Sequence, residues 1–172
     1  LDLDGVDDYV DTISTSVTNG LSQMSVEFWL NINDYTNVLT TTGWTVIGKG
    51  ESFSSNVGSW GIGLGSVLSG ETPSEYGKRI EFYVTDGTYN SGGRKVRKTN
   101  IDLNLNTWYH VVAVFNNNDM KIYIDGVDRT TTATYDATIN NLASISSTIK
   151  MGKIPGLTTD TNGTIDEVAI WN

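Results

Sequence analysis

Cysteine is absent from this sequence of 172 residues, proline occurs twice and histidine occurs once. Without cysteine the fold has no disulfide bonds, zinc–thiolate sites or thiol nucleophiles. The single histidine rules out a His-rich metal site, and no Gly-x-Ser-x-Gly elbow marks a serine nucleophile. No apolar run reaches the roughly 20 residues that a membrane-spanning helix needs, and no signal peptide is recognisable. We therefore expect no membrane insertion, and little of the chemistry on which nucleophilic catalysis depends.

Positive charge is also scarce. Lys and Arg number 11 against 20 Asp and Glu, so the net charge is −9. A chain this acidic repels the phosphates of nucleic acid, and no nucleic acid partner is expected. The local exception is the basic run Arg94–Lys98, close after Lys78 and Arg79. Short charge runs usually line a solvated face, so we expect this run on the exposed side of a hairpin.

The sequence is rich in Thr, Ser and Asn and has 18 glycines, a composition that suits many strands joined by tight turns. Apolar and polar residues alternate most clearly in Ser25–Asn33. There Phe28 and Leu30 point to one face. Glu27 and Trp29 point to the other. A period of two is that of a strand. Arg79–Thr85 and Met120–Asp125 alternate in the same way. In Trp108–Phe115 both faces are largely apolar, which predicts a central strand covered on both sides.

Turn residues separate these segments. Asn116–Asp119 predicts a polar hairpin loop, and Asp125-Gly126 closes the next hairpin. Many short strands spaced this way are typical of a sandwich. The sequence therefore predicts an all-β fold, a two-sheet antiparallel sandwich that forms a single domain over residues 1–172 and is excised from a larger protein. Six further strands are expected at Tyr9–Ile13, Trp44–Lys49, Trp60–Leu64, Lys95–Ile101, Thr148–Lys153 and Thr164–Trp171.

Three motifs occur in order along the chain. The first joins Leu3–Val10 to Ser25–Leu30, the second joins Thr107–Val112 to Lys121–Gly126, and the third is Gly163–Asn172. With these motifs the chain resembles the laminin-G-like jelly-roll domains of the concanavalin A-like lectin and glucanase superfamily. The resemblance implies a curved, concanavalin-like jelly roll whose first and last strands are neighbours. The family is functionally diverse, so the likeness says little about the ligand.

Catalysis is not expected. Some members of the superfamily are retaining glucanases, which need two carboxylates about 5–5.5 Å apart. A Glu-x-Asp-x-x-Glu pattern would supply such a pair on one face of a strand, and the sequence contains none. In the clusters Asp7-Asp8 and Asp166-Glu167 the two neighbours point to opposite faces of a strand. His110 sits in the middle of a predicted strand, where a structural role is expected.

Asp166 is the carboxylate that the alternation singles out. Its parity groups it with Val168 and Ile170, the inward residues of the last predicted strand. A carboxylate that points toward a core is paired, protonated or bound to a cation. In the alternative interpretation, Asp166 caps a turn or accepts backbone N–H bonds.

The family resemblance implies a structural calcium ion between the first and last strands, with a late Asp as ligand. Carried over to this chain, that ligand is Asp166, with Asp4 and Asp7 beside it. Calcium accepts such mixtures of carboxylate and carbonyl oxygens, and the backbone at Gly48 or Lys49 completes the predicted set. The alternative here is that Asp7 belongs to an exposed turn.

Carbohydrate-binding surfaces use exposed aromatic rings, which stack on the apolar faces of sugars, with polar side chains beside them. Trp29 and Trp108 lie in the family motifs, so we expect both to be structural. Trp171 lies in a predicted strand and is expected to pack. Aromatic residues in or beside the long loops are better candidates, although such rings also act as lids over a sandwich edge. The predicted ligand-binding residues are Trp44, Trp60, Tyr76 and Tyr89, with Asn90 and Arg94 as polar partners.

These features predict a non-catalytic recognition module that binds carbohydrate or a glycoconjugate on an extracellular protein or adhesin. The alternative is a structural, decoration or protein-docking domain of a virion or surface assembly, which needs no sugar site. The expected partner is a glycan or a surface protein. The expected location is extracellular, at a cell surface or on a virion. The sequence predicts no oligomeric state.

Overall fold

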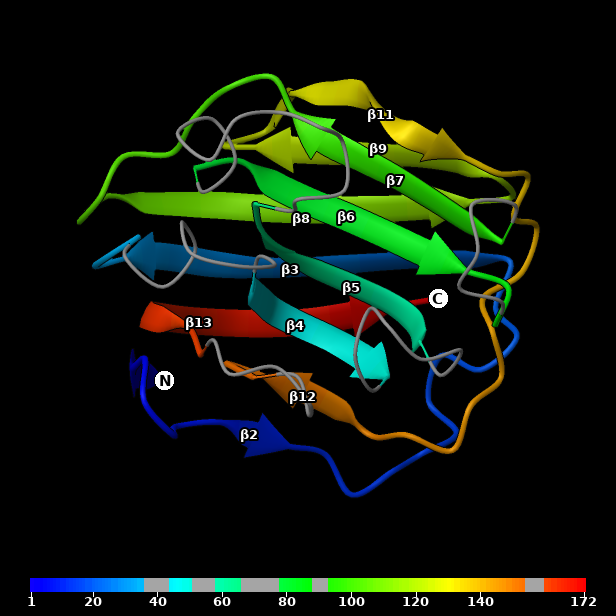
Figure 1. Cartoon of the computed structure of the whole chain (residues 1–172), viewed down its shortest axis with the longest axis horizontal. Helices are drawn as coiled ribbons and strands as arrows, with labels where there is room; N and C mark the ends of the chain where they lie inside the picture. The colour runs from blue at the N-terminus through cyan, green and yellow to red at the C-terminus, as the bar shows by residue number, and fades with distance from the viewer. Residues whose placement is uncertain (36–43, 51–57, 66–77, 88–92, 154–159) are drawn as a thin grey trace.

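The fold is built from strands. The computed structural model describes residues 1–35, 44–50, 58–65, 78–87, 93–153 and 160–172, apart from the side chains of residues 44 and 132–134. Within these ranges every regular element is a β-strand, and the strands form two antiparallel sheets packed as a sandwich (Figure 1). The same part of the chain has no helix long and apolar enough to cross a membrane. The predicted all-β sandwich is confirmed.

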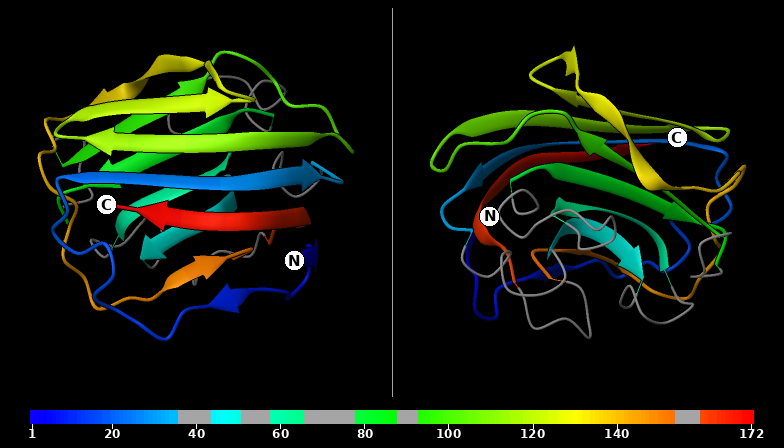
Figure 2. Two further views of the ribbon diagram at one scale, coloured as in Figure 1. Left: turned by 180° about the vertical axis from the view of Figure 1, so that it is seen from behind. Right: turned by 45° about the horizontal axis from the view of Figure 1, so that its top comes forward.

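One sheet has six strands in the order β1-β13-β3-β8-β9-β10 and lies behind the other in Figure 1. Their bounds are Asp2–Asp4 for β1, Asn162–Trp171 for β13, Gln23–Ile32 for β3, Trp108–Asn116 for β8, Asp119–Ile124 for β9 and Val127–Asp128 for β10. Its outer face is turned to the viewer in the left panel of Figure 2.

The other sheet has seven strands in the order β11-β7-β6-β5-β4-β12-β2. Their bounds are Thr130–Asp136 for β11, Arg94–Thr99 for β7, Ile80–Thr85 for β6, Gly58–Leu64 for β5, Trp44–Gly50 for β4, Ile149–Met151 for β12 and Val10–Asp11 for β2. Each predicted strand range therefore overlaps an observed strand, whereas β1, β10 and β11 lie outside the predicted ranges.

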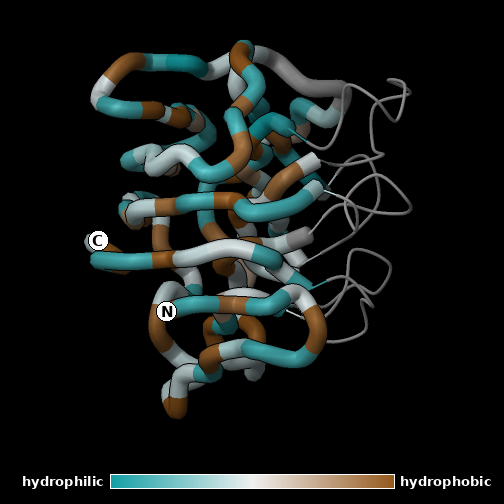
Figure 3. Tube along the Cα trace, turned by 90° about the vertical axis from the view of Figure 1, so that its left-hand side faces the viewer, coloured by the Kyte–Doolittle hydropathy of each residue, from teal (hydrophilic) through white to brown (hydrophobic). Residues whose placement is uncertain are grey.

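The core lies between the two sheets and follows the alternation of the strands. Phe28 and Leu30 of β3 are fully buried and meet Phe82 of β6 in one apolar cluster. Accordingly, short hydrophobic (brown) and hydrophilic (teal) stretches follow one another along the chain trace in Figure 3. Burying a side chain of this size contributes about 1.5–3 kcal/mol relative to leaving it exposed, so the alternating residues drive the packing of the sheets.

The first and last strands are neighbours, as the family resemblance implies. β1 pairs antiparallel with β13, with Leu3 opposite Gly163. The terminal ammonium of Leu1 donates to the carbonyl of Ile165 at 2.8 Å, and the Ile165 amide donates back at 2.9 Å. The N-terminus is thereby tied to the middle of the last strand.

A β-bulge interrupts β13. Asp166 pairs with Trp29 of β3, whereas Ala169 pairs with Glu27, so β13 carries one residue more than its partner between these points. Val168 packs against the core and Asp166 is exposed. The prediction that Asp166 points inward is therefore wrong, because side-chain alternation does not continue through a bulge.

The basic run is also placed differently from the expectation. Arg94, Lys95 and Lys98 are almost fully buried in β7 rather than spread over a solvated hairpin. Lys95 Nζ lies 2.7 Å from Asp136 on β11, and Lys98 Nζ lies 3.8 Å from Glu81 on β6. Because both neighbouring strands supply carboxylates, the sheet can enclose cations that a charge pattern alone assigns to solvent.

Candidate functional site

The outer face of the six-stranded sheet presents aromatic and acidic side chains side by side. Asp166 of β13 is the cross-strand partner of Trp29 on β3, and Trp29 is the partner of His110 on β8. The left panel of Figure 2 shows these three strands adjacent across the face. A hollow of about 430 Å³ opens there, here called the tryptophan hollow, and it is lined by Trp29, Trp108, Asp166 and Glu167.

Both tryptophan rings of this hollow are open to solvent. Trp29 is 37% exposed and Trp108 is 44% exposed, whereas a tryptophan of the core such as Trp60 is fully buried. The Trp29 ring lies 5.2 Å from the His110 ring at an interplanar angle of 40°. The backbone amide of His110 donates to the Asp125 carboxylate at 2.9 Å, which holds the strand that carries this ring. The hollow therefore offers apolar ring surface whose position is supported from one side.

The bulge supplies the acidic wall. The Glu167 amide donates to Asp166 Oδ1 at 2.9 Å, and Glu167 takes a φ of 50°, a left-handed conformation that costs a non-glycine residue about 1–2 kcal/mol. A carboxylate has about four acceptor sites, so this bond leaves Asp166 with further capacity to accept hydrogen bonds. Bulges commonly re-aim side chains beside functional sites. Because of the bulge, Asp166 and Glu167 both line one hollow, so the prediction that these neighbours point to opposite faces of a strand is wrong.

Two of the predicted ligand-binding residues lie away from the surface. Trp60 is fully buried in the core, and its indole N–H donates to Thr18 Oγ1 at 2.8 Å. Arg94 is 3% exposed, with its guanidinium 3.6 Å from the centre of the Tyr135 ring. Neither lines the tryptophan hollow. The other predicted residues lie outside the described part of the structure: the side chain of Trp44, and Tyr76, Tyr89 and Asn90 in full.

Sequence reasoning missed Trp29 and Trp108 because both belong to family motifs and were expected to be structural. A signal for Trp29 was present, since alternation placed it with Glu27 on the polar face of its strand. On that face a large aromatic residue has no core to enter. An aromatic residue in phase with the polar positions of a strand therefore indicates an exposed aromatic ring.

The structure does not bring the predicted calcium ligands together. Asp4 pairs with Asn162, four residues before Asp166 on β13, which places the two backbones about 13 Å apart along the strand. Asp4 Oδ1 instead accepts the Val6 amide at 2.8 Å, and the Asp4 amide donates to Asp8 Oδ2 at 3.2 Å across the turn that contains the exposed Asp7. Among the described residues, no group of three His, Cys, Asp or Glu side chains could hold a metal ion. The donor set does not fit calcium, and calcium binding itself stays an untested prediction.

The backbone donors proposed for that site belong to the other sheet. Gly48 and Lys49 lie on β4, and Lys49 is fully buried. Its ammonium donates at 2.8 Å to the carbonyls of Thr15 and of Val17, and it also donates to Asn19 Oδ1. Burial lowers the pKa of this ammonium. At this end of the core, the cation that these three oxygen atoms surround is thus the Lys49 ammonium.

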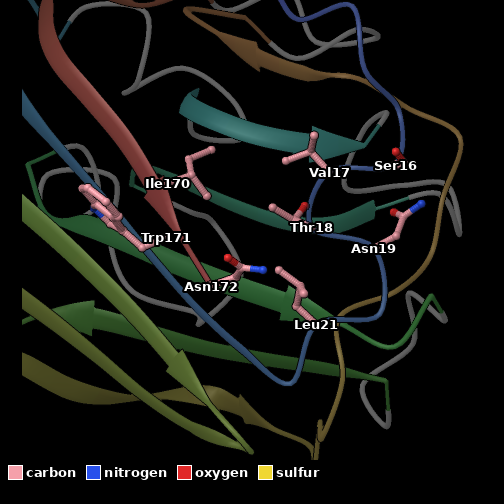
Figure 4. A pocket seen from close by; sticks show the side chains of 8 residues that line it. All are labelled: Ser16, Val17, Thr18, Asn19, Leu21, Ile170, Trp171 and Asn172. Atoms are coloured by element: carbon pink, nitrogen blue, oxygen red, sulfur yellow. The ribbon is translucent and has the colours of Figure 1, made fainter.

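A third exposed tryptophan lies farther along the same outer face. Trp171 is 58% exposed and lines a hollow of about 220 Å³ with Gln23, Ser25 and Asn116, here called the amide hollow. The end of β13 also borders a separate recess of about 280 Å³ at the end of the sandwich, where Ile170 and the segment Ser16–Leu21 meet (Figure 4). The amide hollow shares its sheet face with the tryptophan hollow, so the two can serve one ligand.

Two antiparallel sheets packed face to face define the class of this fold, a concanavalin-like β-sandwich. The chain belongs to the concanavalin A-like lectin/glucanases superfamily, because the laminin-G-like family model of that description matches residues 4–172. The resemblance seen in the sequence motifs is confirmed. No curated protein matches the chain in sequence.

Solved structures share the fold at low sequence identity. A proposed carbohydrate-binding protein from Bacteroides ovatus is 18% identical with a TM-score of 0.66, over 99% of this chain and 44% of that one. Domain 4 of a family-43 extracellular arabinanase from Geobacillus stearothermophilus, solved with arabinotriose, is 17% identical with a TM-score of 0.59, over 90% and 62%. Domains LG4-5 of the mouse laminin α1 chain are 14% identical with a TM-score of 0.60, over 98% and 39%. The chain therefore spans less than half of the first of these proteins.

Proposed function

We propose that this domain is a non-catalytic module that binds carbohydrate in the tryptophan hollow. The observation on which the proposal rests is the pair of exposed rings, Trp29 and Trp108, beside two carboxylates on a rigid sheet. The C–H face of a sugar ring packs on an indole, and its hydroxyl groups donate to carboxylate oxygens. Hydrogen bonds to charged groups are worth about 1.5–3 kcal/mol, so a few of them with ring stacking suffice for specific binding.

The comparisons support this class of ligand without identifying it. One structural neighbour is described in terms of carbohydrate binding, and another was solved with an arabinose oligosaccharide. A shared fold places the strands of these proteins in the same way, but the residues on their surfaces differ from one protein to another. An extracellular, cell-surface or virion-associated location is part of the proposal, since glycans are most accessible there.

A second candidate function is protein docking on a surface assembly. The seven-stranded sheet ends at β2, a short edge strand beside several exposed apolar side chains. Tyr9 is 52% exposed, Val10 is half exposed and Ile13 is fully exposed. An apolar edge with unpaired backbone groups can accept a strand or a flat partner surface. This edge lies on a different sheet from the tryptophan hollow, so the two functions can be separated by substitution.

Affinity electrophoresis tests the carbohydrate proposal. The protein runs through native gels that contain arabinan, xylan, glucomannan, β-glucan or chitosan, and we expect retardation by at least one of them. Trp29→Ala and Trp108→Ala should each abolish most of the retardation, because each removes a stacking surface. Tyr9→Ala, an exposed aromatic change on the other sheet, is the matched control and should leave retardation unchanged.

Two results would count against carbohydrate binding in this hollow. If the unaltered protein migrates at full mobility in every gel, the proposal of carbohydrate binding is contradicted. Equal retardation of the three variants and the unaltered protein would move the site elsewhere. If instead Tyr9→Ala weakens capture of a protein partner while glycans have no effect, the docking function is favoured.

A further inference from the structure

The tryptophan hollow and the amide hollow both lie on the outer face of the six-stranded sheet, at different points along β3 and β13. We infer that the ligand is an extended polysaccharide chain without anionic groups, lying along β3 and β13 from the tryptophan hollow to the amide hollow. This inference rests on the proposed carbohydrate-binding function and specifies its ligand. It follows from three features of the face: the spacing of the tryptophans, the low floor between them and the sign of the charge along the path.

The spacing requires a long ligand. Trp171 on β13 is the partner of Ser25 on β3, and Trp29 lies four residues farther along β3. Four residues of strand span about 13 Å, and an even number of steps keeps both side chains on one face. One sugar ring cannot reach from Trp29 to Trp171. A chain of several sugars can stack on both rings at once.

The floor between the two rings is low enough for a chain to lie on it. The row of side chains halfway along the path consists of Ala169, Glu27 and Val112, which are cross-strand partners and only partly exposed. Ala169 ends at its methyl group, so the exposed indoles on either side stand above this row. Glu27 adds a carboxylate that can accept sugar hydroxyl groups midway.

The amide hollow gives the far end of the path a different polarity. Gln23 Nε2 donates to Asn116 Oδ1 at 3.1 Å across the β3–β8 pair, which fixes the two amides beside Trp171. An amide presents both donors and acceptors, whereas a carboxylate only accepts. Sugar hydroxyl groups therefore meet hydrogen-bond acceptors at the tryptophan hollow, and both donors and acceptors at the amide hollow.

The charge of the path disfavours polyanions. Asp166 and Glu167 lie at one end and Glu27 lies midway. On the described part of this face the nearest lysine is Lys121, opposite Val114, and its ammonium is held 3.1 Å from Asp128. Uronic acids and sulfated sugars would place like charges against these carboxylates, which is destabilising. Neutral chains and chains of amino sugars meet no such repulsion.

The test combines ligand length, charge and the far tryptophan. For each neutral polysaccharide or chitosan that retards the protein, isothermal titration calorimetry is run with its monosaccharide, disaccharide and hexasaccharide. We expect the hexasaccharide to bind at least tenfold more tightly than the disaccharide. Trp171→Ala should remove most of that advantage, so that the affinities for the hexasaccharide and the disaccharide approach each other. Trp171→Phe, which keeps an aromatic ring, should restore the advantage, and melting curves confirm that both variants fold.

The outcomes separate this inference from the function on which it depends. Equal affinity for monosaccharide and hexasaccharide, or no effect of Trp171→Ala, would overturn the extended path while leaving a sugar site at the tryptophan hollow. Retardation by polygalacturonate or heparin would overturn the charge preference. Binding to no glycan of either panel would overturn the inference together with the carbohydrate-binding function.

Discussion

At the scale of single residues, Lys49 shows how the fold stabilises a buried charge with its own polar groups. Its side chain is fully buried, and its ammonium is surrounded by two carbonyls and an amide oxygen from the segment Thr15–Asn19. A buried ammonium is tolerated only when such acceptors replace its water. The lysine thereby joins an irregular segment at the end of the sandwich to β4.

We expect Lys49→Met to lower the free energy of unfolding by about 2–4 kcal/mol, because it leaves buried oxygens without donors. Lys150→Met is the matched control. Lys150 pairs with Asp11 at the surface, where an ion pair contributes about 1 kcal/mol or less. Urea unfolding followed by tryptophan fluorescence measures both. Equal losses in the two variants would show that the oxygens around Lys49 do not depend on its ammonium.

At the scale of elements, the contact of β13 with β3 depends on a close backbone approach. A Cβ placed on Gly163 would lie 2.3 Å from the carbonyl oxygen of Asn31, far inside van der Waals contact. The same strand carries Asp166 into the tryptophan hollow. The position of the acidic wall is therefore set by how closely these two strands pair.

Gly163→Ala should push β13 away from β3. We expect it to destabilise the fold by at least about 2 kcal/mol, which lowers the melting temperature by roughly 4–8 °C in a domain of this size. Gly58→Ala is the control, since a Cβ at Gly58 meets nothing within 4 Å. Differential scanning calorimetry compares the two. An unchanged melting temperature for Gly163→Ala would mean that the strands can separate without loss.

The pairing of β11 with β7 has a pH dependence. Hydrogen bonds from Lys95 and from Arg97 hold the pKa of Asp136 at about 2. Because this pKa lies below the unfolded value of about 4, the carboxylate stabilises the fold above pH about 4, and the contribution is lost as pH falls toward 2. Asp136→Asn should flatten that part of the stability curve. Asp136 is more than half exposed, so the effect should be small.

The measurement for Asp136 is the melting temperature at pH values between about 2 and 5, for the unaltered protein and for Asp136→Asn. Asp102→Asn, which removes the partner of Arg79 at the surface, serves as comparison. Parallel curves for Asp136→Asn and the unaltered protein would show that Lys95 and Arg97 do not depend on this carboxylate.

At the scale of the whole molecule, the alternation of the strands was enough to predict the sandwich. Phe28 and Leu30 were assigned to the core from their period alone, and both are buried there. The site was predicted much less well. The bulge at Asp166 has no local signal in the alternation, and the burial of Lys98 depends on Glu81 of a neighbouring strand. Such features arise from pairing across strands, which a linear pattern does not contain.

The aromatic residues illustrate the same division between fold and site. Trp60 was expected beside a loop and proved to be part of the core, because its alternate residues Ile62 and Leu64 also point inward. Trp29 was expected to be structural and lies at the surface. Aromatic residues suit both environments, so only their phase relative to neighbouring apolar residues separates the two.

The bulge on β13 also has a consequence for how the proposed binding surface can change over evolution or in the laboratory. Glu167 lies within the register shift and has no partner residue in the β13–β3 register. Its exposed side chain is outside the core, so a new residue there alters the wall of the hollow without disturbing the packing. Its left-handed backbone narrows the choice to Asn, Asp, Gly and a few others. Single substitutions at position 167 can therefore change the ligand specificity of the proposed site without changing the packing of the two sheets.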